Sequence, residues 1–316
     1  MKSSIRRLPV RAGKSLSKRR SNCLALRPSG RRGSRQDLTL IGPGRLGQAL
    51  GRLLTDAGCP VRYVVARRLE KARRAARFIG AGATALGLAA RELTDAQVVL
   101  LTASDAALAP LARHLAVLRR DWSGKVVLHT CGALPSAVLR PLERRGAAIG
   151  SMHPFQTIPD PRTGVRNLPG CYWGIEGDAR ARRVATRLVR ALGGIPFRVV
   201  GSRKALYHAA AFLTCPTIVT LMDRSARLLR LAGVPGRIAR PMLGRFVRET
   251  VGNFERLGPR RALTGPAVRG DWQTIAHHRR ALQRFAPDFV PVYQELVRAM
   301  MRLARRRQLP HSERAR

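Results

Sequence analysis

The chain has 316 residues, of which 45% are hydrophobic, so it can form two domains with cores of their own, and a mainly disordered protein is excluded. Lysine and arginine outnumber aspartate and glutamate by 60 to 18, which gives a net charge of +42. Only twelve of the 60 cations lie in residues 1–36, so the charge is spread along the chain; it attracts anionic ligands in general and identifies no single partner.

Residues 1–36 are rich in arginine and serine and contain no acidic residue, which predicts a flexible basic extension. Its composition is similar to that of an organelle transit peptide, and a translation start assigned too far upstream would explain it equally well. A third interpretation is a tether to nucleic acid or to a membrane surface. We expect no specific nucleic-acid partner.

From Asp37 onward, short β-branched runs alternate with helical stretches, the pattern of parallel strands joined by helical crossovers. Seven strands are predicted, at residues 38–41, 61–66, 98–102, 125–129, 147–152, 172–175 and 197–200. They indicate an α/β domain over residues 37–200, built on a doubly wound and mainly parallel sheet.

After Gly201 the strand pattern stops, and four long helical patterns follow at residues 204–231, 237–257, 272–284 and 288–307. They predict an all-α domain over residues 201–307 and a short tail over residues 308–316. The uncharged stretch 205–222 has about the minimum length of a membrane span, but His208, Pro216 and three threonines interrupt it. We expect a helix buried in a helical domain or at a dimer interface, and no membrane span.

A GxGxxG motif follows the first predicted strand and opens a predicted helix. The first glycine of such a motif makes a tight turn, the second admits a pyrophosphate, and the third packs the helix on the strand. The free N–H groups of the helix then bind the anion. The predicted cofactor-binding residues of this turn are Gly42, Gly44, Arg45, Leu46 and Gly47.

The end of the second predicted strand indicates which dinucleotide binds. Proteins selective for NAD place an acidic residue about twenty residues after the motif, whereas arginine accommodates the 2′-phosphate of NADP. Here Arg67 and Arg68 occupy that place. The sequence therefore favours NADP over NAD, although arginine is frequent enough in this chain to occur there by chance.

Ligands of open α/β sheets bind beyond the carboxyl ends of the strands, where this chain has short polar residues and histidines. Each of these histidines also has a purely structural interpretation. Thr102 and Ser104 are predicted to line the cofactor site, and the predicted substrate-binding residues at this edge are His129, Thr130, Gly132 and His153.

Two residues at the start of the helical half are candidate proton donors. Lys204 and His208 lie four residues apart, so they share one face of a predicted helix next to an apolar stretch. Lys204 could instead be a solvated end residue. Further along, Asp271 is a predicted helix N-cap, and Arg269 is a candidate for holding a substrate carboxylate.

Five cysteines lie far apart without a CxxC pair, so the sequence indicates neither a disulfide framework nor a zinc site. We expect no bound metal. A reducing, cytoplasmic location fits this cysteine usage best.

Several motifs in this order resemble a family of Rossmann-like NADP-dependent oxidoreductases whose C-terminal half is a helical domain of unknown function. The resemblance covers residues 37 to about 305 and includes distant similarity to pyrroline-5-carboxylate reductase, ketopantoate reductase and the 6-phosphogluconate dehydrogenase type. The motifs are residues 42–47, 129–134, 153–157, 175–178, 204–211, 263–266 and 269–271.

The resemblance implies an N-terminal NADP domain, a C-terminal domain that forms a homodimer, and a substrate cleft between the two. One departure concerns the helix that begins near Lys204. Related reductases often carry asparagine one to two turns beyond this lysine, whereas residues 212–216 here read Phe-Leu-Thr-Cys-Pro. The usual pairing of lysine with asparagine is therefore in doubt.

Together these observations predict an NADP-dependent reductase of a small anionic keto or imino acid, with a ketopantoate-like acid as one candidate substrate. The alternative is a regulatory or sensing protein that binds NADP without catalysis.

Overall fold

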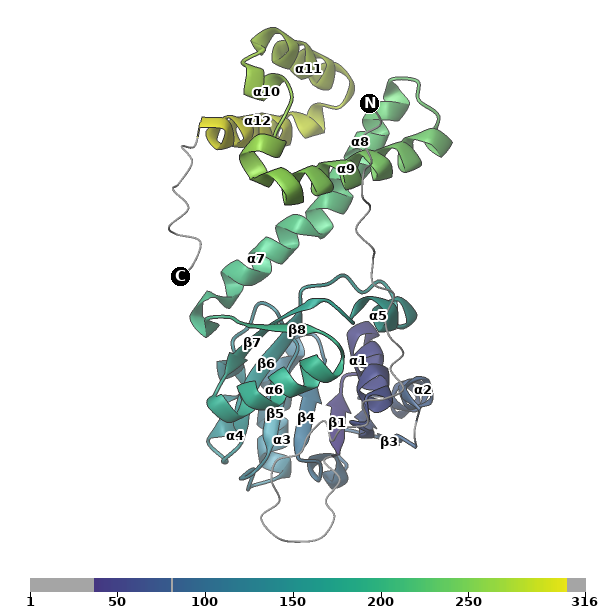
Figure 1. Ribbon diagram of the computed structural model, residues 1–316. Coiled ribbons are helices and arrows are strands. Elements are labelled where there is room, and N and C mark those ends of the chain that lie inside the picture. The colour runs from purple at the N-terminus through teal and green to yellow at the C-terminus, as the bar shows by residue number, and fades with distance from the viewer. Residues whose placement is uncertain (1–36, 81, 306–316) are drawn as a thin grey trace, which may run out of the picture. The chain divides into compact units, whose positions relative to one another are not determined.

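The structure is a computed structural model that describes residues 37–80 and 82–305 (Figure 1). The predicted basic extension and the predicted tail after residue 307 lie outside the described residues. The chain forms two compact units, the first ending at Leu213 and the second beginning at Thr214. The domain boundaries expected from the sequence stay a prediction.

The first unit is built on one sheet of eight strands in the order β3-β2-β1-β4-β5-β6-β7-β8. All neighbouring strands run parallel except β6 and β7, which are antiparallel. The order reverses between β1 and β4, which is the position where doubly wound sheets bind dinucleotides. The strands are β1 (Leu38–Ile41), β2 (Val61–Val65), β3 (Thr84–Leu86), β4 (Val98–Leu101), β5 (Val126–His129), β6 (Ala148–Pro154), β7 (Tyr172–Gly177) and β8 (Ile195–Arg198).

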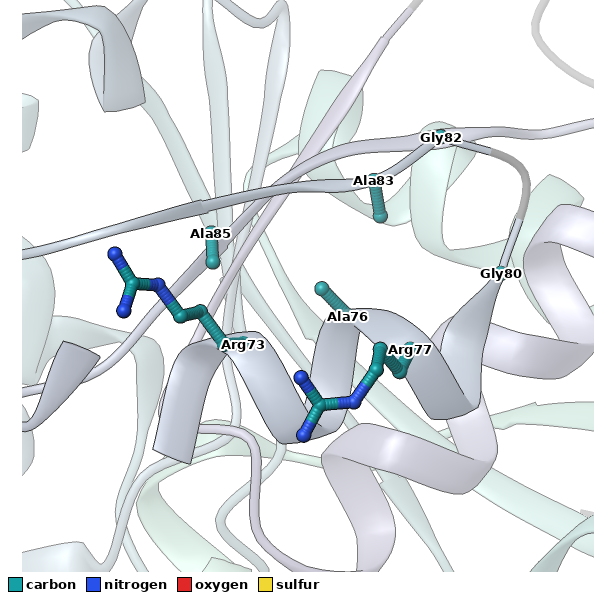
Figure 2. Close-up of a pocket in the computed structure, with 7 residues that line it drawn as sticks. All are labelled: Arg73, Ala76, Arg77, Gly80, Gly82, Ala83 and Ala85. Carbon is teal, nitrogen blue, oxygen red and sulfur yellow. The ribbon is translucent and has the colours of Figure 1, made fainter. Parts of the chain in front are cut away.

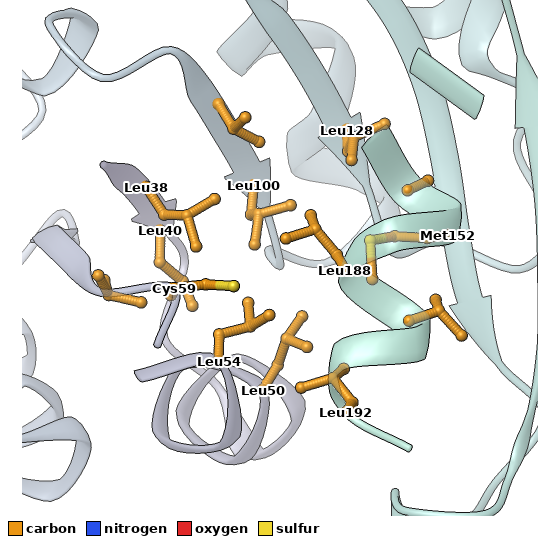
Figure 3. Close-up of a cluster of buried hydrophobic side chains, with 14 of the residues drawn as sticks. Leu38, Leu40, Leu50, Leu54, Cys59, Leu100, Leu128, Met152, Leu188 and Leu192 are labelled. Carbon is orange, nitrogen blue, oxygen red and sulfur yellow. The ribbon is translucent and has the colours of Figure 1, made fainter. Parts of the chain in front are cut away.

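Helices cover both faces of this sheet because its strands carry apolar side chains on both sides. On one face, leucines of α1 (Arg45–Asp56) and α6 (Ala179–Ala191) pack against alternate residues of the strands, as Figure 3 shows. The opposite face is covered by α3 (Asp105–Leu118) and α4 (Arg140–Glu143). The other helical elements of the unit are α2 (Leu69–Ile79), η2 (Arg91–Thr94), η3 (Ser136–Leu139), α5 (Pro161–Asn167), η4 (Gly201–Arg203) and α7 (Lys204–Thr214).

The second unit is entirely helical in its described residues. Asp271 caps α11 as predicted, since its carboxylate accepts a hydrogen bond from the backbone N–H of Thr274 at 3.0 Å. The elements are α8 (Pro216–Leu231), α9 (Gly236–Ala262), α10 (Pro266–Arg269), α11 (Trp272–Phe285), η5 (Pro287–Phe289) and α12 (Val290–Arg305). A mainly parallel α/β sheet followed by an all-α region confirms the predicted fold class.

Two expectations about the elements were wrong. The sheet has eight strands where seven were predicted, because β3 is a three-residue edge strand without a strong β-branched pattern. The predicted helix over residues 204–231 consists of α7 and α8, which end and begin on either side of Cys215. Pro216 cannot donate a backbone hydrogen bond and disfavours helical geometry at the preceding residue, which explains the break.

The apolar stretch 205–222 is not buried within the chain, contrary to one of the two expected environments. By length and composition alone, the segment Gly201–Leu231 could cross a membrane. Its first turns, however, bind to the sheet, since Lys204 donates to Cys131 and Tyr207 bonds to His153. Only residues 209–222 remain uncharged beyond these contacts, which is shorter than a typical membrane span.

Candidate functional site

The glycine-rich turn after β1 is packed so tightly that two of its positions admit only glycine. Gly42 has a φ of +84°, and a Cβ there would lie 2.7 Å from the backbone of Ala103. A Cβ at Gly47 would lie 2.3 Å from the hydroxyl oxygen of Thr102. These distances match the roles predicted for the first and third glycines of the motif.

The second glycine of the motif, Gly44, has free space around the position of a side chain, in contrast to Gly42 and Gly47. A Cβ at Gly44 would meet nothing closer than the carbonyl oxygen of Gly42 at 3.9 Å. Gly44 is also the N-cap of α1, where no side chain caps the helix and no acidic residue lies in the first turn. The first N–H groups of α1 therefore have no side-chain partner and face an open cradle, the arrangement in which a helix N-terminus binds a pyrophosphate.

Arg67 and Arg68 lie beside this cradle. The turn is attached to the end of β2, because the N–H of Gly42 donates a hydrogen bond to the carbonyl of Val65 at 2.9 Å, and the two arginines come shortly after Val65. Both arginines are exposed and lie two and three residues beyond the end of β2. Neither guanidinium group forms an ion pair with any described residue, so both are available to an anion. The cradle at the N-terminus of α1 fits a diphosphate, and the two adjacent arginines fit the additional phosphate that distinguishes NADP from NAD.

Thr102 stabilises the turn from below. Its hydroxyl donates to the carbonyl of Gly42 at 2.8 Å, and its side chain is almost fully buried. Ser104 is exposed at the N-cap of α3 and forms no capping hydrogen bond there, so its hydroxyl can meet a ligand. The two predicted cofactor-lining residues thus have different surroundings: Thr102 holds the turn, and Ser104 faces solvent.

Lys204 is the most deeply buried cation of the candidate site, with 2% of its surface exposed. Its Nζ donates to the carbonyl of Cys131 at 2.7 Å and to the hydroxyl of Ser151 at 2.6 Å, and it lies 3.8 Å from Glu176 Oε1. Burial lowers the pKa of Lys204 to about 8, while the charge of Glu176 opposes this shift. Lys204 is therefore not the solvated end residue that the sequence left open.

His208 lies one helical turn beyond Lys204 and is half-buried. A Cβ added to Gly132 would lie 2.5 Å from His208 Cδ2 and 2.8 Å from His153 Nε2. The two imidazole rings pack edge to face with centroids 5.8 Å apart. The structure thus brings together three of the predicted residues from the ends of β5 and β6 and from α7.

Tyr207 orients His153 from the other side. The Nδ1 atom of His153 lies 2.9 Å from the Tyr207 hydroxyl, which also donates to the carbonyl of His153 at 3.3 Å. Burial lowers the pKa of His153 to about 4 and raises that of Tyr207 to about 12. Both side chains are therefore neutral at physiological pH, with His153 Nε2 directed toward Gly132.

His129 and Thr130 lie deeper than a substrate-binding role requires. His129 is fully buried, and its Nδ1 accepts the N–H of Cys131 at 3.1 Å, which fixes the turn after β5. Burial lowers the pKa of His129 to about 3. Thr130 is buried and its N–H donates to Leu101. These surroundings match the structural interpretation of His129.

Arg269 belongs to α10 of the second unit, and its predicted contact with a substrate carboxylate stays a prediction. A hollow of about 470 Å³ lies between α2 and the start of β3, and Arg73 and Arg77 are among the residues that line it (Figure 2). It contains none of the predicted site residues. Among the described residues, no cluster of three or more metal-ligating side chains occurs.

Sequence reasoning missed the partners of Lys204. Ser151 lies within β6, Glu176 within β7 and Ser136 at the start of η3, and all three are buried polar residues. Glu176 stands in one of the motifs that carried the resemblance but had received no role. A polar residue inside the predicted strand 147–152 is a signal that could have pointed to Ser151, whereas Glu176 and Ser136 lie outside the predicted strands.

Two family models match the chain in tandem. Residues 25–154 match a Rossmann-like domain, and residues 171–300 match a domain of unknown function, DUF2520. No curated protein sequence matches the chain. The predicted combination of an N-terminal dinucleotide-type domain with a helical domain of unknown function is confirmed.

Solved structures with the same fold cover nearly the whole described chain. A Bacteroides fragilis protein to which NADP oxidoreductase activity is ascribed has 24% identity and a TM-score of 0.68, covering 85% of this chain and 100% of its own. A reductive aminase from Aspergillus terreus in complex with NADPH and ethyl levulinate has 18% identity, a TM-score of 0.63 and coverage of 85% and 94%. A pyrroline-5-carboxylate reductase from Coxiella burnetii has 15% identity, a TM-score of 0.56 and coverage of 86% and 100%. At these identities the similarity establishes a common fold.

Proposed function

We propose that this chain, which joins a Rossmann-like domain to a DUF2520 domain, is an NADP-dependent oxidoreductase that reduces a small keto or imino acid. The observation that carries the proposal is the open, uncapped cradle at Gly44, with Arg67 and Arg68 unpaired beside it. The structural relatives that are named for NADP or NADPH support the same cofactor.

NADPH supplies the hydride when bound, and the protein has to hold it and provide a proton. The first N–H groups of α1 bind the diphosphate, and the two arginines bind the 2′-phosphate. Thr102 keeps the turn closed by holding the carbonyl of Gly42. Ser104 lies at the N-terminus of α3, beyond the end of β4, where a nicotinamide ring would meet the substrate.

His208 is the proton donor that the geometry favours over Lys204. Its ring is half-buried against Gly132, whereas the ammonium group of Lys204 is enclosed and bonded to protein acceptors. His153, held neutral, packs against His208 and fixes the orientation of its ring. The substrate carbonyl or imine would then lie above Gly132. Its carboxylate would need a cation as partner, and Arg269 is the candidate that the sequence offers.

The cofactor assignment is tested by calorimetric titration of the protein with NADPH and NADH. We expect NADPH to bind at least about tenfold more tightly, because a charge-assisted hydrogen bond contributes about 1.5–3 kcal/mol. The double variant Arg67→Ala/Arg68→Ala should lose this preference and leave NADH affinity unchanged. The matched control Arg73→Ala/Arg74→Ala removes the same charge from α2 and should preserve the preference.

The reaction is tested in the same preparations with ketopantoate, pyruvate and 1-pyrroline-2-carboxylate as probes at saturating NADPH. His208→Ala should lower kcat by about 10²- to 10⁴-fold, the usual contribution of a general acid, without changing NADPH affinity. If NADPH binds and none of the probes or a wider metabolite panel is reduced, the regulatory alternative is favoured. If neither nucleotide binds, the oxidoreductase proposal is wrong.

We propose that the protein forms a homodimer, because apolar side chains of α7 are exposed. Leu206 and Leu213 of α7 are each more than half exposed. Such apolar side chains favour cover by a second chain. Light scattering after size-exclusion chromatography should give twice the chain mass of 34.8 kDa.

A further inference from the structure

The buried network around Lys204 joins five segments that are far apart in the sequence. Lys204 comes from α7, Glu176 from β7, Ser151 from β6 and Ser136 from η3, and Cys131 lies in the turn after β5. The side chains of Lys204 and Glu176 are 2% and 8% exposed. A charge pair enclosed to this degree needs hydrogen bonds that compensate for the lost hydration.

The hydrogen bonds of Glu176 supply that compensation. Its Oε1 accepts the N–H of Ser136 at 2.5 Å and the hydroxyl of Ser151 at 2.9 Å, and its Oε2 accepts the hydroxyl of Ser136 at 2.9 Å. Three donors directed at one carboxyl group are what an ionised carboxylate accepts. The negative charge beside Lys204 is thereby fixed in place.

Ser151 connects the two charges with a defined direction. Because its hydroxyl hydrogen points to Glu176, its oxygen lone pairs face the ammonium group of Lys204. The remaining hydrogen bond of Lys204 goes to the carbonyl of Cys131, the residue before Gly132. Lys204 therefore links α7 to the turn against which His208 packs, one helical turn away.

We propose that Ser151 and Glu176 are positioning residues that hold the charged Lys204 on the Cys131 carbonyl and so set the distance between His208 and the Gly132 turn. The proposal rests on the proposed function, in which His208 donates the proton. It gives Lys204 an indirect role in the reaction. Gly132 leaves no spare room at this contact, since even a Cβ would clash with both histidines.

The charged state of Lys204 is measured directly by NMR of the Cε carbons in protein labelled with ¹³C-lysine. The chain has only six lysines, and exposed Lys71 serves as an internal reference. Glu176, Cys131 and Asp105 raise the pKa of Lys204, burial lowers it, and the buried rings of His129 and His153 lie close enough to feel its charge. We expect its titration midpoint near pH 8 to move to lower pH in Glu176→Gln and in Ser151→Ala, while Lys71 stays unchanged.

The effect on the site is read from the ring signals of His153 and His208 and from kinetics with ketopantoate, pyruvate and 1-pyrroline-2-carboxylate. Both variants should shift these signals and lower kcat by about 10²-fold, as a displacement of about 1 Å can do, with KM and NADPH affinity nearly unchanged. The control Ser225→Ala removes a hydroxyl that donates to Leu221 in α8 and should change none of these quantities.

A purely structural role predicts a different result. The single variants Lys204→Met and Glu176→Gln each leave one buried group without its charged partner, so both should have a lower melting temperature than the wild type. The double variant Lys204→Met/Glu176→Gln removes both charges and should regain the lost melting temperature. Under the proposal its kcat stays low; recovery of kcat together with stability would overturn it. The proposal would also be overturned if the titration of Lys204 and the ring signals of His153 and His208 were unchanged in Glu176→Gln and Ser151→Ala. Failure of the wild type to bind NADPH would count against the proposed function and leave the NMR result standing.

Discussion

Gly42 and Gly44 are two residues apart in one motif, but replacing them by alanine should have different effects, on the stability of the fold and on NADPH affinity respectively. Gly42→Ala forces a side chain into a positive-φ position and against the backbone of Ala103, so it should destabilise the fold. Gly44 has a φ of −75°, which alanine also adopts, and the space around an added methyl group is free. The Gly44→Ala protein should therefore fold normally. The same methyl group would fill the cradle, and NADPH affinity should fall by at least about tenfold.

Thermal melting and calorimetric titration of both variants separate these effects. Gly58→Ala is a useful comparison for Gly42→Ala, because Gly58 also has positive φ but no atom within 4 Å of an added Cβ. A Gly44→Ala protein that binds NADPH as tightly as the wild type would contradict the assignment of the cradle.

Residue roles could be predicted from the sequence where their cause is local. The glycines of the turn and the cap at Asp271 follow from the geometry of a few neighbouring residues. The partners of Lys204 could not be predicted, because Ser151 is 53 residues away and its position depends on sheet register. His129 was expected to bind a substrate because it stands at the end of a predicted strand, but it is fully buried, and burial depends on contacts with residues that are distant in the sequence.

At the scale of elements, Asp178 at the start of α6 connects this helix to the sheet. Asp178 caps α6 by accepting the N–H of Ala181 at 2.8 Å, and it also accepts the N–H of Ile149 in β6 at 2.6 Å. Asp178→Ala removes the cap and leaves a buried donor unpaired, so it should lower the free energy of unfolding by about 2–3 kcal/mol.

Asp271→Ala provides the comparison within the same chain. Asp271 caps α11 through Thr274 alone and has no partner in a strand, so the expected loss is about 1 kcal/mol. Urea unfolding of the two variants gives the difference. Equal losses would mean that the hydrogen bond to Ile149 contributes nothing.

Most elements could be predicted because their periodicity is strong. The first strand was located to the residue, and the other predicted strands differ from the observed ones by one or two residues at one or both ends. The edge strand β3 has too few β-branched residues to stand out. The helix over residues 204–231 was predicted as continuous because its apolar pattern runs through Cys215, and the constraint imposed by Pro216 outweighs that pattern.

At the scale of the whole molecule, the buried histidines should make folding sensitive to acid. Burial lowers the pKa of His129 to about 3 and that of His153 to about 4, from 6.5 in an exposed ring. Below pH 6.5 the unfolded chain therefore binds protons that the folded protein does not, so stability falls as the pH falls toward 4. At pH 5 the two rings together should cost about 3–4 kcal/mol relative to pH 7.

Urea unfolding at pH 7, 6 and 5 measures this dependence. His153→Asn should remove about half of the decrease, whatever its effect on stability at pH 7. A free energy of unfolding that does not change over this interval would mean that both rings take up protons in the folded state.

The sheet also has a consequence for the design of chimaeras with related proteins. The Rossmann-like match stops at residue 154, the last residue of β6, while β7 and β8 belong to the segment after residue 170. A recombinant fragment cut between the two matches would expose the long edge of β6 and invite aggregation. The junction for exchanging helical halves should therefore follow Leu213, where the first unit ends with its sheet complete.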